Sequence, residues 1–246
     1  MTGEPDDLPL AGDTPPTSSG NPIDRPALAE DLLLLLFQPA SGVIAGESTL
    51  YYPLAGAVMA DLALEERVTT STTTMGSITV QAVEGREPLD DILHSAWKYV
   101  LDKPRRVPGV LSSIGPKLRE PLLARLIARG DLRIEKRKRL GMFTSEVHVQ
   151  GGTGRRAALL DSVRAVLVDQ KEPSARTAAL AALLWGSGAL PHFDPQIPWS
   201  SAVIARAQEL EQGNWGAGAA AQAVARTMTA VLVTNPTIAA NALPKN

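Results

Sequence analysis

The sequence predicts a mainly α-helical fold, in which a single compact helical-bundle domain carries one or two β-hairpins. Apolar residues recur at helical spacing along most of the chain. Aromatic residues make up only 4% of the 246 residues while Ala and Leu abound, which favours closely packed helices over a sandwich or barrel. Two segments rich in β-branched or alternating residues interrupt the helical pattern and predict the hairpins.

The first half of the domain opens with a Leu-rich segment, residues 28–37, which suits a buried helix or a buried strand. Residues 53–66 follow with helical spacing, and Pro53 fits the first turn of that helix. The runs 68–74 and 77–83 are rich in Thr, Val and Ile and predict a β-hairpin. Residues 88–101 form an amphipathic stripe with acidic residues near its start, where the helix dipole favours them.

The second half begins with a loop at 103–109, overlapped by a short helix or turn at 107–113. Residues 117–129 predict an amphipathic helix closed by Gly130, and 131–150 a second, protruding β-hairpin with a basic first strand. The Gly-rich stretch after it predicts a linker, because no Lys-Ser/Thr pair follows to make a phosphate loop. Further helical patterns cover residues 155–169, 174–185, 203–211 and 216–233.

The domain boundaries follow from composition. Residues 1–26 are acidic and rich in Pro and Gly, which predicts a flexible tail before a single domain at 27–233 and a loose segment at 234–246. The start lacks the basic and apolar regions of a signal peptide, and no apolar run reaches the length of a membrane span. We therefore expect a cytoplasmic protein that meets membranes only peripherally.

The sequence contains few residues that suit metal binding, redox chemistry or catalysis. Cysteine is absent and only three histidines occur, none paired at metal-ligand spacing, so we expect neither a metal nor a cofactor. The adjacent carboxylates of Asp90-Asp91 diverge on a helix, and no nucleophile motif is present. We predict a non-enzymatic protein, with His192 and Asp194 near Trp199 as the residual enzyme alternative.

Charge is distributed very unevenly along the chain. Its net charge is -2, yet residues 1–40 hold seven acidic residues and one basic, while 98–139 hold thirteen basic residues and four acidic. Such clustering suits an anionic membrane surface, with about 1 kcal/mol gained per basic residue near it. The predicted lipid-binding residues are Lys117, Arg119, Arg125, Arg129, Lys136, Arg137, Lys138 and Arg139. Met142 and Phe143 at the hairpin tip are predicted to insert among the lipids.

Several segments in order resemble one known family. They are the Leu-rich opening, PLAGAVMADLALEERV at 53–68, PLDDIL at 88–93, and KLREPLLARLIARGDL at 117–132 leading into a hairpin with Gly141-Met142-Phe143. Their order and spacing from about residue 28 to 233 resemble the Golgi phosphoprotein three family in its bacterial branch. The resemblance implies a helical single domain with a protruding hairpin. It also implies binding of phosphatidylinositol 4-phosphate and retention of client proteins as an adaptor.

The family's headgroup site uses a Trp, an Arg nine residues later, and two basic residues three apart on a later helix. Arg119 falls on the second helix position, and Pro116 on the first, with Lys117 beside it. Ala55 stands where the earlier Arg belongs and Gly46 near the Trp, with two tyrosines close by. Each lost guanidinium removes charge-assisted bonds of about 1.5 to 3 kcal/mol. We therefore expect binding to anionic surfaces rather than selectivity for that one lipid.

Two further partners stay open from the sequence. Helix 117–129, Gly130 and the basic hairpin match the helix-then-wing order of a winged helix, which makes nucleic acid the second-ranked partner. The hairpin strand at 147–149 is also a candidate for pairing with another copy of the chain, as a homo-oligomer.

Overall fold

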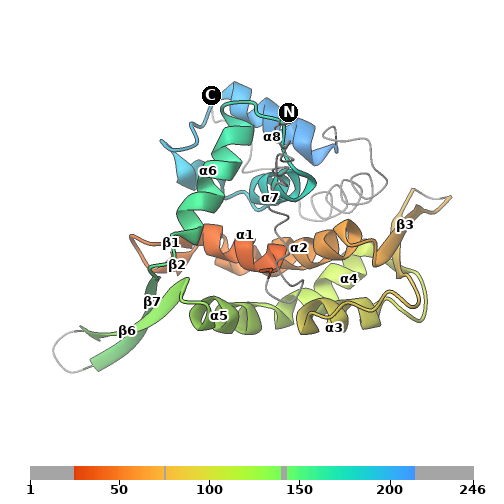
Figure 1. Cartoon of the computed structure of the whole chain (residues 1–246), viewed down its shortest axis with the longest axis horizontal. Coiled ribbons are helices and arrows are strands. Elements are labelled where there is room, and N and C mark those ends of the chain that lie inside the picture. Colours follow the sequence, from red (N-terminus) through yellow and green to blue (C-terminus); the bar gives the residue numbers. More distant parts are fainter. Residues whose placement is uncertain (1–24, 75, 140–142, 214–246) are drawn as a thin grey trace, which may run out of the picture.

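The computed structural model describes residues 25–74, 76–139 and 143–213. Its helices stack in three layers (Figure 1). The middle layer is α1 (Leu28–Leu36) and α2 (Tyr51–Leu64). One side is covered by α6 (Arg155–Leu167), α7 (Ala175–Gly186) and α8 (Ser201–Glu211); the other by α3 (Asp91–Tyr99), α4 (Val107–Ile114) and α5 (Arg119–Ala128). Short 3-10 turns complete the described segments: η1 (Glu47–Thr49), η2 (Gly115–Lys117) and η3 (Leu190–Phe193).

The core lies between these layers and is built around α1. Every residue of α1 is buried, because α2, α5, α6 and α7 all pack against it. The leucines at 32–36 are fully buried. Two acidic residues of the same helix, Glu30 and Asp31, are buried with them. A helix that buries charge in this way needs compensating partners on the surrounding elements.

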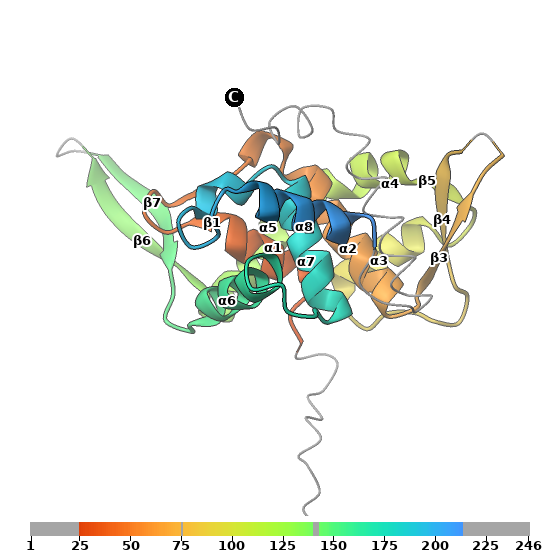
Figure 2. The ribbon, with the colours of Figure 1, turned by 90° about the horizontal axis from the view of Figure 1, so that it is seen from above.

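The described strands form three antiparallel sheets. β1 (Phe37–Gln38) pairs with β2 (Val43–Ile44) in a short turn. The strands β3 (Val68–Thr72), β4 (Ile78–Ala82) and β5 (Arg105–Arg106) form the second sheet, in that order. The third is the hairpin of β6 (Leu132–Arg139) and β7 (Phe143–Gln150). Figures 1 and 2 show this hairpin and the β3–β4–β5 sheet projecting from opposite ends of the molecule.

The mainly α-helical single-domain prediction and both predicted hairpins are confirmed. The Leu-rich opening is a helix, because its ends find polar partners that satisfy the terminal N–H and C=O groups. The predicted loop at 103–109 was wrong in part: Arg105 and Arg106 pair with β4, and α4 starts directly after them. The predicted tails and the helix at 216–233 lie outside the described residues, except for Arg25 and Pro26.

Two glycines permit close approaches that fix the layers near the basic segment. A Cβ at Gly115 would collide with the carbonyl oxygen of Tyr51, at the start of α2. A Cβ at Gly151 would collide with the carbonyl oxygen of Gly130, where the hairpin returns to the body. Gly115 thus seats η2 against α2, and Gly151 fixes the base of the hairpin.

Among the described residues, no helix combines the length and the apolar character that a membrane-crossing segment requires.

Candidate functional site

Both ends of the buried helix α1 are satisfied by charged side chains. At its start, the backbone N–H of Ala27 donates to Glu30 Oε1 at 3.1 Å, and that of Leu28 donates to the carboxylate of Asp61. At its end, Arg156 donates to the carbonyl oxygens of Phe37 and Leu35, at 3.1 and 3.3 Å. Carboxylates at the N-terminus and a guanidinium at the C-terminus also match the helix dipole.

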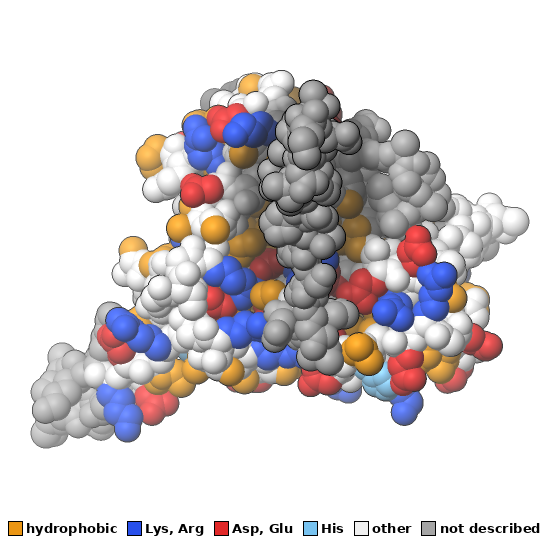
Figure 3. Space-filling model, in the orientation of Figure 1, with side chains coloured by type: hydrophobic (Ala, Val, Ile, Leu, Met, Phe, Trp, Pro, Cys, Tyr) orange, Lys and Arg blue, Asp and Glu red, His pale blue; other side chains and the backbone are white. Residues whose placement is uncertain are grey.

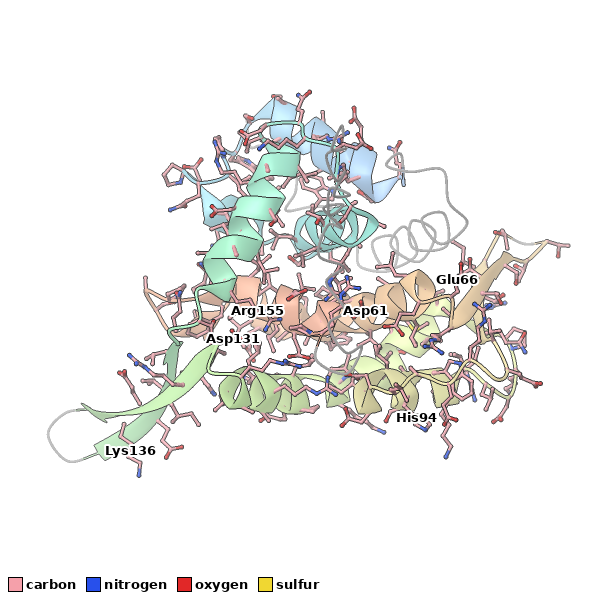
Figure 4. All side chains as sticks on the ribbon, in the orientation of Figure 1. Asp61, Glu66, His94, Asp131, Lys136 and Arg155 are labelled. Atoms are coloured by element: carbon pink, nitrogen blue, oxygen red, sulfur yellow. The ribbon has the colours of Figure 1, made fainter. Side chains whose placement is uncertain are left out.

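Two arginines from the covering helices reach three buried aspartates. Asp31 of α1 accepts from Arg155 of α6 at 2.5 Å and from Arg176 of α7 at 2.6 Å. Arg176 continues to Asp61 at 2.6 Å, and Arg155 to Asp131, which also accepts from the Thr153 hydroxyl. Figure 4 shows Arg155 and Asp131 together at the base of the hairpin. This buried network joins the hairpin, the covering helices and α1–α2.

One carboxyl group of this network titrates near neutrality. Burial raises the pKa of Asp61 from 3.8 to about 6, because lost hydration outweighs the Arg176 charge and the Leu28 N–H bond. The folded state therefore holds this proton more tightly than the unfolded chain does. The stability that Asp61 contributes is complete below about pH 4 and is lost as the pH rises through about 6.

Asp61→Asn is expected to remove this pH dependence. Between pH 7 and 5 the wild type should gain on the order of 1 kcal/mol of unfolding free energy relative to the variant. Urea unfolding of both proteins at the two pH values measures the difference. Parallel pH profiles for the two proteins would show that Asp61 does not titrate in this range.

Two predicted lipid-binding residues, Arg125 in α5 and Arg129 directly after it, are engaged in ion pairs. Glu30 is fully buried and accepts from Arg125 Nη1 at 3.2 Å and from Arg129 Nε at 3.0 Å. Arg125 also donates to Asp90, at 2.6 Å, and to Asp91. These carboxylates, together with the Asp90 hydrogen bond, raise the Arg125 pKa despite its partial burial. Arg125 and Arg129 therefore hold α5 and α3 to α1, a structural role that the sequence interpretation lacked.

Arg119 and Lys117 lie where α5 begins, beside η1. Arg119 Nε donates to Glu47 at 2.5 Å and its Nη1 to Glu120 at 2.5 Å, and these bonds raise its pKa. Lys117 is exposed and, within the described chain, has no ion pair. The fold thus brings the Gly46–Glu47 turn and the start of α5 together. The guanidinium of Arg119, however, is already paired there with the carboxylate of Glu47.

A cavity of about 340 Å³ opens beside this pair. It is lined by Arg119 and Glu47, by the β1–β2 turn, and by His148 of the hairpin. Val43 of that turn is 58% exposed, and Ile134, directly across the ladder from His148, is 48% exposed. The lining therefore combines one neutralised cation, Arg119, with one exposed apolar side chain, Val43. Ala55, at the position of the family's first arginine, is fully buried in α2 and contributes nothing to the mouth.

The basic hairpin stands clear of the helical body (Figures 1 and 2). Its ladder pairs Lys136 with Glu146, Arg137 with Ser145, Lys138 with Thr144 and Arg139 with Phe143. Lys136 is exposed and points away from the body (Figure 4). The side chains of Arg137, Lys138, Arg139 and Phe143, and all of Met142, lie outside the described part of the chain. The ladder still fixes four consecutive cationic positions at the far end of one strand.

The residual enzyme alternative has no support in the geometry. His192 and Asp194 are both exposed, and Asp194 accepts from the backbone N–H of Trp199 at 3.2 Å rather than from the imidazole. No group of three or more metal-ligating side chains occurs among the residues that the structure describes.

Figure 3 shows basic and acidic side chains interleaved across the middle of the face seen in Figure 1, as an ion-pair network requires.

Sequence reasoning missed the residues that organise the site: Glu30, Asp31, Glu47, Asp61, Asp131, Arg155 and Arg176. A signal was present for some of them. Glu30-Asp31 directly precede five leucines, and charges that share a helix with such a run are buried and need partners. The arginines that supply those partners lie 95 to 145 residues later in the chain, beyond the reach of local patterns.

Comparison with known proteins agrees with this picture. No curated protein matched the sequence. The sequence model of the Golgi phosphoprotein 3 (GPP34) family matches residues 28–227, which include every described helix and strand. Membership of that family is consistent with a non-enzymatic role in binding lipid or protein. The chain therefore belongs to the Golgi phosphoprotein 3 (GPP34) family.

Proposed function

We propose that the protein is a non-enzymatic peripheral membrane protein that binds anionic phospholipid through its projecting basic hairpin and acts as an adaptor for a protein client. The observation that carries the proposal is the hairpin itself. Four consecutive cationic positions, 136 to 139, lie on a strand that extends away from the helical body. A cluster of this size is typical of segments that bind anionic membranes.

Lys117 and Arg119 form the second, weaker part of the proposed membrane surface. Arg119 already pairs with Glu47 and Glu120. The net charge of these three residues and Lys117 is therefore zero. A lipid phosphate has to displace the Glu47 carboxylate before it reaches the guanidinium. This arrangement favours general attraction to anionic membranes over selection of one phosphoinositide headgroup. Arg125 and Arg129 are left out of the proposed surface, because their carboxylate partners already hold them.

Vesicle sedimentation tests the proposal. We expect the protein to sediment with vesicles of phosphatidylcholine and phosphatidylserine at moderate salt, and to stay in solution with phosphatidylcholine alone. Addition of salt should release it, because screening weakens the attraction. Equal, negligible sedimentation with both vesicles would contradict the proposal. A mobility shift of duplex DNA at the same salt, without vesicle binding, would favour the nucleic-acid alternative.

Glu47→Gln is expected to strengthen binding to anionic vesicles. The substitution keeps the size of the side chain but removes the charge that neutralises Arg119, which frees about 1 kcal/mol of attraction, or roughly fivefold in affinity. Titration with phosphatidylserine vesicles measures the change. Glu84→Gln is the matched control, because Glu84 is exposed and lies near the opposite end, beyond β4. Equal gains in both variants would show that Arg119 does not face the membrane.

A further inference from the structure

A groove runs between α3 and the α4–α5 segment, away from the hairpin, and it shares only Lys117 with the weaker part of the proposed membrane surface. Its volume is about 430 Å³. One wall is a face of α3 with Asp91, Ser95 and Tyr99 four residues apart, and the other carries Ser113, Lys117 and Pro121 at the same spacing. Four residues of α-helix rise about 6 Å, so the α3 wall is about 12 Å long; the other wall is made by α4, η2 and the first turn of α5 in succession. The floor between them is apolar: Ile92, Ala96, Ile114 and Leu118.

Side-chain bonds clamp the groove at both ends. At one end the Tyr99 hydroxyl donates to Ser113 Oγ at 2.9 Å, and at the other Asp91 accepts from Arg125. The two walls therefore run antiparallel, and Lys117 lies opposite Ser95, midway along. These bonds fix the position of one wall relative to the other. The groove is therefore preformed, and an occupant does not have to open it.

Most polar groups of the groove rim are already engaged. Ser95 Oγ donates to the carbonyl oxygen of Asp91 at 2.8 Å, and Ser113 Oγ donates to that of Gly109 at 2.7 Å. Lys117 differs, because no hydrogen bond or ion pair engages its ammonium group within the described residues. An occupant therefore meets an apolar floor and one unpaired cation at its middle.

The position of Lys117 midway along the groove favours a helical peptide over a single-chain lipid as the occupant. A single-chain anionic lipid carries its charge at one end, so a headgroup on Lys117 leaves half of the groove uncovered. An amphipathic helix with a carboxylate flanked by apolar side chains one turn away on each side covers the whole floor and pairs with Lys117. Docking of such a helix through side chains spaced by one turn is a common mode of peptide recognition.

We propose that this groove binds an amphipathic helical segment of a client protein, with an acidic residue that pairs with Lys117 and apolar residues one turn before and after it. The inference rests on the adaptor part of the proposed function and names the chemistry of the client. The hairpin, which is the main part of the proposed membrane surface, lies elsewhere, and Ser95 belongs to the groove alone, so a change at Ser95 tests the two proposals separately.

Selection from a displayed library of helical peptides tests this proposal. The wild-type protein is expected to enrich peptides with Asp or Glu between apolar residues at one-turn spacing. Lys117→Glu should enrich Lys or Arg at that position instead, since its charge is reversed. Ser95→Trp, a change on the exposed rim, fills the groove and should weaken the selected peptides at least about tenfold.

The Ser95→Trp variant also separates the two proposals. It is expected to keep the wild-type melting temperature and vesicle binding while losing the peptides, so a failure of membrane binding in all variants leaves this result unaffected. Absence of any enrichment, or enriched peptides that bind Ser95→Trp as tightly as wild type, would overturn the inference. Decanoate binding that Ser95→Trp abolishes, with no peptide enriched, would overturn it in favour of a single-chain lipid.

Discussion

Asp31→Ala is expected to lower the free energy of unfolding by about 3 to 5 kcal/mol, the cost of breaking a buried ion pair from one side. Asp31 is 5% exposed and accepts from both Arg155 and Arg176. Its removal leaves Arg155 and Arg176, each more than four-fifths buried, without the carboxylate that they share. Urea unfolding at neutral pH measures the loss.

Asp169→Ala is the matched control for this loss. Asp169 pairs with Arg164 at 3.0 Å, but both side chains are more than one-third exposed. Pairs of that kind contribute at most about 1 kcal/mol. Asp31→Asn, which keeps the side-chain shape, provides a milder variant if the alanine protein does not fold. Losses for Asp31→Asn no larger than those of the control would show that the buried network does not hold the layers together.

Neutralising the hairpin is expected to abolish membrane binding. Replacing Lys136, Arg137, Lys138 and Arg139 by glutamine removes about 4 kcal/mol of attraction, at roughly 1 kcal/mol per cation, or close to a thousandfold in affinity for anionic vesicles. The fold should be unaffected, because the hairpin projects from the body and Lys136 is exposed. Sedimentation with phosphatidylserine vesicles measures the loss, and circular dichroism checks the fold.

A second variant with the same change in net charge tests whether the position of the cations, rather than their number, determines vesicle binding. Arg86, Lys98, Lys103 and Arg106 are exposed cations that lie in β5 or close to β4 or β5 in sequence, or at the end of α3. Figure 1 shows the β3–β4–β5 sheet at the end of the molecule opposite the hairpin. Replacing these four by glutamine should leave most of the vesicle binding intact. If both variants lose affinity equally, net charge rather than the hairpin governs binding, and the proposed membrane surface is misplaced.

Local patterns were sufficient to predict most elements of the fold. The helical stripe at 88–101, the Thr-rich hairpin and the basic hairpin all arise from residues close in sequence, and the structure has each of them. The strand at Arg105–Arg106 was missed because it consists of two residues whose pairing depends on β4, more than twenty residues earlier.

The basic segment shows the limit of reasoning from charge alone. Arg125 and Lys117 look alike in sequence as cations of one helical stretch, yet Arg125 contacts three carboxylates and Lys117 has none within the described residues. The difference is set by Glu30, Asp90 and Asp91, which tertiary packing brings to Arg125 from α1 and from the start of α3. Which cations remain available to a ligand therefore depends on contacts between distant segments.

The long sequence separations within the buried network have a consequence for synthesis on the ribosome. Asp31 is paired with Arg155 and Arg176, which follow it by 124 and 145 residues. At about 5–20 residues per second, on the order of 10 s pass between translation of Asp31 and of its last partner. During that time the five leucines of α1 lack the cover of α6 and α7, so part of their apolar surface is open to solvent. Helix α1 therefore precedes all the other described helices in translation but completes its native ion pairs only after α7 has been made.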